Sequence, residues 1–413
     1  MNTLLEKPIE LALSELDEIR HLEADAVMGT YARNPVLFVR GEGATLWDSE
    51  GKSYLDFLGG IAVISVGHCH PHVTATIAEQ AGKLVHVSNL FYNEFQGKLA
   101  AKLCDLTGME RVFFCNSGAE ASECALKLAR KWGKQNKSEA AIEIVTFSGS
   151  FHGRTMGAVT ATAQPKYQTP FAPLVPGFHY ADRNDLAAAE KLIGANTCAV
   201  FLEPIQGESG IHPMTPEFMQ GLRKLCDERN VLLIADEVQC GMGRTGDFLA
   251  IQGYGVLPDV VTMAKGLANG FPIGACLARG EAAHTLVPGD HGSTFAGQPL
   301  ACAAAWATLE VLENENLMQN AAEVGACFKT ELEALKAKYP NLISEVRGKG
   351  LMLGMDFATP QAKSAQTELR DAGIIVNATS ENTLRFLPPL NVTKEDCRRV
   401  VQEIECFLQN NPA

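Results

Sequence analysis

Two apolar segments of this 413-residue chain end in side chains that could act as an acid and as a nucleophile. The run 231–235, Val-Leu-Leu-Ile-Ala, precedes Asp236 and Glu237, and the run 260–264, Val-Val-Thr-Met-Ala, precedes Lys265. Ligands of open parallel sheets bind beyond the carboxyl ends of the strands, so we expect Asp236 and Lys265 to share one crevice. Burial lowers the pKa of a lysine and favours its nucleophilic, neutral amine. Taken singly, a surface lysine and a capping or ion-paired aspartate are the commoner explanations.

A third segment is suited to bind an anion at the N-terminus of a helix. Residues 113–120, Phe-Phe-Cys-Asn-Ser-Gly-Ala-Glu, predict a strand, a turn of small residues and the start of a helix. Gly118 and Ala119 would leave backbone N–H groups open toward a phosphate, although a plain strand-to-helix turn has the same pattern. Phe151 and Arg154 follow another apolar run and offer a ring for stacking and a guanidinium for a carboxylate.

In combination, these residues match the needs of an enzyme that uses pyridoxal phosphate. Such an enzyme needs a lysine that forms a Schiff base and an acid that keeps the pyridine nitrogen protonated. It also needs a phosphate cup, an apolar contact for the ring and an arginine for the substrate carboxylate. Their joint occurrence, in this order along one chain, is stronger evidence than any one of them. We therefore predict pyridoxal 5'-phosphate as the cofactor, attached to Lys265.

Two other motifs indicate different chemistry, and we reject both interpretations. The run Gly241–Gly246 matches the dinucleotide-binding pattern GxGxxG, which is typical of nicotinamide-dependent dehydrogenases. However, residues 236–239 separate it from the preceding strand, and Gly253, Gly255 and Pro258 prevent the long helix that this fingerprint requires. The cluster His68–His72 contains three histidines but has no complementary Cys or His pair nearby. We therefore predict no metal site.

Composition limits the partners of the chain. Its formal net charge of −13 argues against nucleic acid or an anionic membrane, because both require a basic surface. No apolar run is long enough to span a membrane, and the acidic segment 1–23 does not resemble a secretory signal. The 12 cysteines are scattered and form no CxxC pair, which is typical of reduced thiols. These features predict a cytoplasmic protein that acts on small molecules.

The elements that must position these residues alternate along the chain. From about residue 111, short apolar runs alternate with helical segments, which predicts an α/β fold with a mostly parallel sheet covered on both faces. The predicted strands are Arg111–Cys115, Ile142–Phe147, Cys198–Leu202, Val231–Ala235, Val260–Ala264 and Gly274–Ala278, and the predicted helices include Glu120–Lys134 and Pro216–Arg229.

The pattern changes near residue 306, which predicts a second, smaller α+β domain. We expect strands at Gly350–Phe357 and Ile374–Val376 and a closing helix at Lys394–Leu408. The predicted domains are an N-terminal segment 1–60 that packs on the small domain, a large domain 61–305 and the small domain 306–413. The N-terminal segment should contain short strands around Leu37–Asp48.

Seven short segments closely resemble the class III (subgroup II) aminotransferases, and the resemblance runs through nearly the whole chain. They are Asn116–Ala121, Phe151–Thr155, Glu203–Glu208, Asp236–Gln239, Ala264–Gly266, Gly292–Phe295 and Leu384–Phe386. Within this class, the run Ser88–Glu94 and the chain length are most similar to the acetylornithine aminotransferases.

The resemblance implies a fold-type I homodimer with active sites shared between subunits and with pyridoxal phosphate as cofactor. It implies Lys265 and Asp236 as the catalytic residues. The further cofactor contacts that it implies are Ser117, Gly118, Ala119, Phe151, Glu237, Val238 and Gln239, together with the partner subunit's Thr294. The substrate contacts that it implies are Arg154, Ser293, Arg385 and Glu208, in which Glu208 masks Arg385 during one half-reaction.

The reaction that the resemblance implies moves the δ-amino group of N2-acetylornithine to 2-oxoglutarate. The products are N-acetylglutamate 5-semialdehyde and glutamate. Ornithine, succinylornithine and 4-aminobutyrate enzymes share most of these motifs. Ornithine, succinylornithine and succinyl-diaminopimelate aminotransferases remain alternatives. A catalytically silent binding protein on the same fold is a further alternative, which the presence of both Lys265 and Asp236 disfavours.

Overall fold

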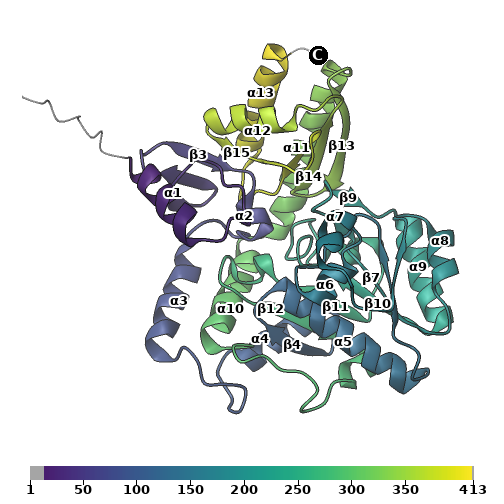
Figure 1. The fold of residues 1–413 in the computed structure, drawn as a ribbon. Coiled ribbons are helices and arrows are strands. Elements are labelled where there is room, and N and C mark those ends of the chain that lie inside the picture. The colour runs from purple at the N-terminus through teal and green to yellow at the C-terminus, as the bar shows by residue number, and fades with distance from the viewer. Residues whose placement is uncertain (1–13, 412–413) are drawn as a thin grey trace, which may run out of the picture.

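A seven-stranded sheet forms the larger part of the computed structural model, which describes residues 14–411 (Figure 1). Every neighbouring pair is parallel except those of β12, which runs antiparallel to both β4 and β11. The order across the sheet is β4 (Arg111–Cys115), β12 (Gly274–Ala278), β11 (Val260–Met263), β10 (Leu232–Asp236), β7 (Thr197–Leu202), β5 (Glu143–Phe147) and β6 (Phe178–Ala181). The predicted α/β fold with a mostly parallel sheet is confirmed.

Both faces of this sheet are buried, as its apolar strands predict. Leu232 and Ile234 of β10 pack into one core with the helix α5 (Gly118–Asn136), whereas Leu233 between them packs into the opposite core with α9 (Pro216–Arg229). This alternation follows from the two-residue period of a strand. A strand buried on both faces needs apolar residues throughout, which explains the continuous apolar runs of the sequence.

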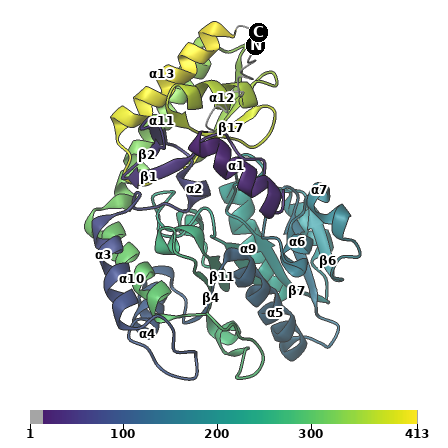
Figure 2. The ribbon, with the colours of Figure 1, turned by 60° about the vertical axis from the view of Figure 1, so that its left-hand side comes forward.

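Further helices complete the larger part of the molecule. The helix α10 (Pro299–Asn314) lies beside α3 (Pro71–Lys83) and α4 (Gln96–Thr107), and the three helices gather at one side of the sheet (Figure 2). Short helices α6 (Met156–Ala161), α7 (Pro165–Gln168) and α8 (Leu186–Leu192) lie between strands of the sheet in the sequence. None of the helices within residues 14–411 has the length and apolar character that a membrane crossing requires.

Two smaller sheets lie together in the upper part of Figure 1. The first contains β13 (Ile343–Lys349), β14 (Met352–Phe357), β17 (Thr383–Phe386) and β16 (Asn377–Ala378), and it packs with α11 (Leu317–Lys338), α12 (Ala362–Asp371) and α13 (Lys394–Asn410). The second contains β1 (Phe38–Glu42), β2 (Thr45–Asp48), β3 (Ser53–Asp56) and β15 (Ile374–Ile375).

The second of these sheets joins distant parts of the chain, because β3 pairs with β15 in parallel and brings Leu55 opposite Ile374. The N-terminal strands therefore lie against the C-terminal part of the chain. The domain bounds 1–60, 61–305 and 306–413 stay a prediction, and residues 1–13 and 412–413 of these domains lie outside the described residues.

The segment α2 (Gly59–Ala62) is one turn of left-handed helix. The φ angles of its residues lie between 55° and 65°, and the N–H groups of Val63 and Ile64 close the turn on the carbonyl of Gly59 at 2.8 and 2.9 Å. A Cβ on Gly59 would lie 2.5 Å from the carbonyl oxygen of Leu387, so this position requires glycine. Ile61 has a β-branched side chain in a conformation that costs an L-residue about 1–2 kcal/mol.

We predict that glycine is better tolerated than alanine at position 61, the reverse of the usual preference. Both replacements remove the Ile61 side chain beyond Cβ, and glycine removes Cβ as well. Because only glycine adopts a positive φ without strain, Ile61→Gly should nevertheless be more stable by about 1 kcal/mol. Urea unfolding measures the difference. At Val39, which is exposed in the extended strand β1, alanine should be the more stable replacement. The same order of stability at both positions would contradict strain at Ile61.

Candidate active site

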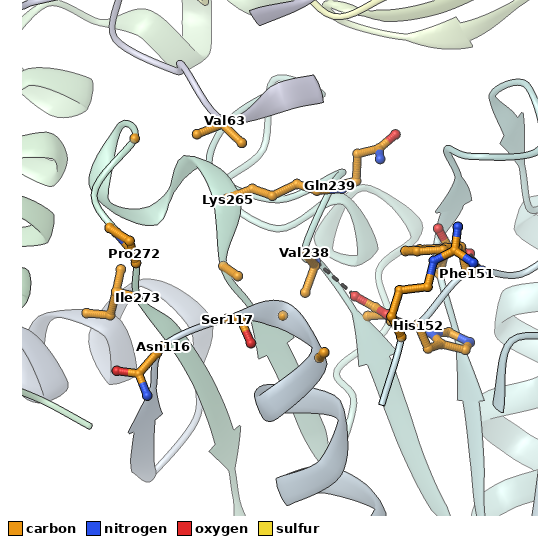
Figure 3. Close-up of a pocket in the computed structure, with 18 of the residues that line it drawn as sticks. Val63, Asn116, Ser117, Phe151, His152, Val238, Gln239, Lys265, Pro272 and Ile273 are labelled. Atoms are coloured by element: carbon orange, nitrogen blue, oxygen red, sulfur yellow. Dashed lines mark hydrogen bonds and ion pairs between the residues drawn. The ribbon is translucent and has the colours of Figure 1, made fainter. Parts of the chain in front are cut away.

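A cavity of about 370 Å³ lies beyond the carboxyl ends of the parallel strands. Its walls come from the segments that follow β4, β5, β7, β10 and β11, together with Val63 and the loop 270–273 (Figure 3). The structure therefore brings the strand-end residues Asp236 and Lys265 to one place, although β10 and β11 are separated by a long connection. The lining residues are Val63, Asn116, Ser117, Gly118, Ala119, Phe151, His152, Gly153, Arg154, Glu203, Asp236, Val238, Gln239, Ala264, Lys265, Gly270, Phe271, Pro272 and Ile273.

Lys265 stands two residues after the end of β11 in the left-handed region, with a φ of 45°. Its side chain extends below Val63 toward Gln239 (Figure 3). Loss of solvent in the cavity wall lowers the pKa of Lys265, while the negative charge of Glu208 counteracts part of this effect. A lowered pKa increases the fraction of neutral amine, which is the form that attacks a carbonyl carbon.

Asp236 ends β10 and is 3% exposed. One of its oxygens lies 2.6 Å from Nδ1 of His152, and the other accepts the N–H of Val238 at 3.0 Å. The His152 ring is itself stacked on Phe201 with a distance of 3.9 Å between the ring centroids. These contacts fix the orientation of a buried carboxylate that lines the cavity. Sequence reasoning missed His152, whose only signal was its place beside Phe151 after an apolar run.

Glu203 is a second buried carboxyl group that sequence reasoning left without a role. It follows β7 and accepts the N–H groups of Phe151 at 2.9 Å and Gly207 at 3.3 Å. Burial raises the pKa of Glu203 well above its usual range, and the neighbouring charge of Asp236 raises it further. Its two hydrogen bonds join the segment before Arg154 to the segment that carries Glu208.

The N-terminus of α5 forms a cup of backbone donors in the cavity wall. Ser117 caps the helix, because its hydroxyl accepts the N–H of Glu120 at 3.2 Å. The N–H groups of Gly118 and Ala119 have no acceptor among residues 14–411. A Cβ on Gly118 would lie 2.8 Å from Val238, so a side chain here would fill the cup. This geometry fits a phosphate, which helix N-termini bind through free N–H groups and the helix dipole.

Aromatic side chains surround Arg154 at another wall of the cavity. Its guanidinium carbon lies 4.0 Å from the centroid of the Tyr167 ring and 5.3 Å from that of Phe151. Arg154 is exposed, and no carboxylate within residues 14–411 forms an ion pair with it. It is therefore a cation held by rings and open to an anion from solution.

A second arginine, Arg385 of β17, is 1% exposed and lies next to the cavity. Its Nη1 lies 3.0 Å from Oε1 of Glu208, and its Nη2 donates to Asn377 at 2.7 Å. Gln239, which lines the cavity, donates to the same Glu208 oxygen at 3.2 Å. Burial alone would raise the pKa of Glu208, but the charge of Arg385 and the hydrogen bonds hold it below its usual range.

Five predicted site residues do not line this cavity: Arg385 and Glu208, which lie next to it, and Glu237, Ser293 and Thr294. Glu237 points away from it, and its buried carboxyl group accepts the N–H groups of Ala250 and Ile251 at 2.9 and 2.8 Å; burial raises its pKa to about 7. Ser293 lies at its edge, where its hydroxyl accepts from Asn116 at 2.9 Å. Thr294 is exposed on the loop 291–297.

The two rejected motifs have structural explanations. Gly243 and Gly246 lie in a loop with φ angles of 81° and 100°, where a Cβ would meet Met318 or Ala322 of α11. No α-helix follows this loop before β11. The three histidines of the cluster 68–72 each face a carboxylate, which belongs to Asp56 for His68, to Glu315 for His70 and to Glu310 for His72, at 2.7–2.8 Å.

The donor set of the cavity fits pyridoxal phosphate. The free N–H groups at the start of α5 suit its phosphate, and the buried carboxylate of Asp236 suits a protonated ring nitrogen. The amine of Lys265, with its lowered pKa, suits the aldehyde. Phe151 and Val238 supply apolar walls for the planar ring.

Comparison with known proteins agrees with this geometry. The family model for class III aminotransferases matches residues 28–408. The acetylornithine aminotransferase of Caldanaerobacter subterraneus subsp. tengcongensis is 46% identical over 94% of this chain and 98% of that protein. The succinylornithine transaminase of Citrobacter koseri is 47% identical over 90% of this chain and 92% of that protein.

A solved structure extends the comparison to the fold. The ornithine aminotransferase of Toxoplasma gondii superimposes with a TM-score of 0.92 at 35% sequence identity and covers 97% of both chains. The match thus extends over the large sheet and the two smaller four-stranded sheets. This chain belongs to the class III family of aminotransferases, whose cofactor is pyridoxal phosphate.

Proposed function

We propose that this chain transfers the δ-amino group of N2-acetylornithine to 2-oxoglutarate and releases N-acetylglutamate 5-semialdehyde and glutamate, a step of arginine biosynthesis. The similarity to relatives named acetylornithine aminotransferase supports the choice of donor. The observation that carries the proposal is the pair of arginines at the cavity, because Arg385 is paired with Glu208 whereas Arg154 has no carboxylate partner among residues 14–411. A donor with one carboxylate and an acceptor with two can then use the same site.

The proposed roles of the two strand-end residues follow from their chemistry. When bound, pyridoxal phosphate supplies a carbonyl carbon for the amine and a protonated ring that accepts electron density from the substrate carbon. Lys265 is the attachment point, and its amine, once displaced by the donor, carries the proton from the substrate carbon. Asp236 keeps the ring nitrogen protonated, with His152 and the Val238 N–H holding its carboxylate in place.

The remaining residues have proposed roles in binding. Ser117, Gly118 and Ala119 hold the phosphate, Phe151 and Val238 enclose the ring, and Gln239 contacts the ring hydroxyl. Arg154 binds the carboxylate of the donor while Glu208 masks Arg385, which avoids a buried arginine without a partner. Glu208 then releases Arg385 for the α-carboxylate of 2-oxoglutarate, and Ser293 is a further substrate contact.

We also propose a homodimer in which the partner subunit's Thr294 completes the phosphate site. In this chain, Thr294 and Phe295 are exposed beside another exposed apolar run, Leu90–Tyr92. Asn89 and Asn93 tie the two loops together by donating to the carbonyls of residues 296 and 297 at 2.7 and 3.0 Å. An exposed apolar surface of this kind is typical of a subunit interface.

The compartment that we propose is the cytoplasm. All 12 cysteines are free thiols, and several of them are buried close to the large sheet. A reducing compartment preserves such thiols, whereas disulfides are typical of oxidising compartments.

The attachment of the cofactor to Lys265 can be tested chemically. Borohydride should fix pyridoxal phosphate covalently on Lys265, and peptide mapping by mass spectrometry should locate the label. Lys265→Ala should lower turnover by several orders of magnitude, because one side chain provides both the covalent anchor and the proton carrier. A label on a different lysine would contradict this assignment.

The choice of donor can be tested by comparing kcat/KM for acetylornithine, succinylornithine, ornithine and succinyl-diaminopimelate with 2-oxoglutarate as acceptor. We expect the highest value for acetylornithine. A higher kcat/KM for another donor would show that this donor is the preferred substrate, and the proposed aminotransferase reaction would still hold. No turnover with any donor, in a protein that retains its cofactor, would favour the silent binding protein.

The masking of Arg385 can be tested with Glu208→Gln. Loss of the negative charge weakens the pair with Arg385, so kcat/KM for glutamate as donor should rise relative to that for acetylornithine. Glu345→Gln is a matched control, because Glu345 pairs with another β-strand arginine, Arg347, at 2.9 Å and lies outside the cavity. An unchanged ratio in Glu208→Gln would rule out the masking role.

A further inference from the structure

Arg154 is held at the cavity by an aromatic surface and by no polar partner within the described residues. Its guanidinium carbon lies 4.0 Å from the centroid of the Tyr167 ring, which is within the range of a cation–π contact. Phe151 packs against Tyr167 in a T-shaped contact, with 5.9 Å between the two ring centroids. Tyr167 therefore touches both the proposed carboxylate-binding arginine and the proposed wall of the cofactor site.

The turn that carries Tyr167 is anchored to the segment that carries Arg154. Gln164 is 9% exposed, and its amide donates to the carbonyl of Ser150 at 2.9 Å, directly before Phe151. The N–H of Tyr167 in turn donates to the carbonyl of Gln164 at 3.0 Å. On the other side, Gln168 donates to the carbonyl of Thr160 at 2.9 Å. Hydrogen bonds of the residues before and after Tyr167 thus anchor the turn that carries its ring.

We propose that Tyr167 is a positioning residue that holds the Arg154 guanidinium in the orientation needed to bind the donor carboxylate. This inference rests on the proposed role of Arg154. An arginine has several rotatable bonds, and a free one loses side-chain entropy when it binds a ligand. A ring that already restricts the guanidinium reduces this cost without neutralising the charge, whereas a carboxylate partner would compete with the substrate. Lys166, 4.7 Å from the same ring, adds positive charge beside it.

The experiment compares two donors that differ only in the carboxylate. N2-acetylornithine carries it, and N-acetyl-1,4-diaminobutane has the same chain without it. Tyr167→Leu should raise KM for acetylornithine roughly three- to tenfold. It should leave kcat almost unchanged, because the contact stabilises the bound substrate and the transition state alike. KM for the carboxylate-free donor should not change.

Two further variants separate the ring from other effects. Tyr167→Phe keeps the aromatic face and should restore the wild-type KM. Tyr180→Phe removes a hydroxyl that bonds the carbonyl of Thr160 at 2.9 Å and lies 3.1 Å from the Gln168 amide, so it disturbs the same turn without touching Arg154. It should have no effect on either KM. Thermal unfolding of each holoenzyme checks that the variants are folded.

Several results would overturn the proposal. An equal rise of KM for both donors in Tyr167→Leu would indicate a general distortion of the cavity, and no rise would show that Arg154 needs no ring. A Tyr167→Phe variant as impaired as Tyr167→Leu would assign the effect to the hydroxyl. If the wild-type enzyme uses a different donor, the same comparison is made with that donor and its analogue without the carboxylate. A wrong choice of donor in the proposed function can thereby be distinguished from a wrong role for Tyr167.

Discussion

The rest of the structure depends on one constraint, which is that charged groups buried near the carboxyl edge of the large sheet must be compensated. A buried charge is costly unless a partner and hydrogen bonds compensate it. Asp236 has His152 and a backbone N–H, and Arg385 has Glu208 and Asn377. The fold makes this possible because the loops after the strands bring distant segments together, so that Asp236 meets His152 after β5 and Arg385 meets Glu208 after β7.

Unusual backbone conformations gather near the cavity. Lys265 and Ile61 both have positive φ angles, and Val63 follows the left-handed turn directly. Such conformations persist where the surrounding structure determines them, and they direct side chains that regular elements would point elsewhere. At Lys265, the sharp change of direction after β11 places the amine in the cavity rather than in the sheet.

The sequence predicted the large sheet well and the smaller sheets poorly, for a physical reason. The strands β4 and β12 and the helix α9 have the predicted bounds. For β12 the reason is that a strand buried on both faces is apolar throughout. The edge strand β6 and the strand β13 were not predicted. Both contain polar or charged residues, such as His179 in β6 and Arg347 in β13, which interrupt the apolar pattern.

The sequence predicted those parts of the site that lie at the ends of apolar strands. Asp236 and Lys265 each follow an apolar run, and that position alone indicated a shared crevice. The contact of His152 with Asp236 joins residues 84 positions apart, and no local pattern indicates it. Glu237, which also ends a strand, faces the opposite way and bonds the backbone of residues 250 and 251, because successive residues of an extended segment point to opposite sides.

The two arginines of the site show how one cavity keeps two cations in different states. Arg385 is buried, so an unpaired charge there would be costly, and Glu208 compensates it. Arg154 is exposed to water, so its charge needs no counterion, and aromatic rings can hold it without neutralising it. Burial therefore determines that Arg385 must separate from Glu208 before it binds a ligand, whereas Arg154 can bind a ligand directly. In the proposed reaction, the carboxylate common to both substrates would meet the exposed arginine, and the carboxylate of the acceptor alone would meet the buried one.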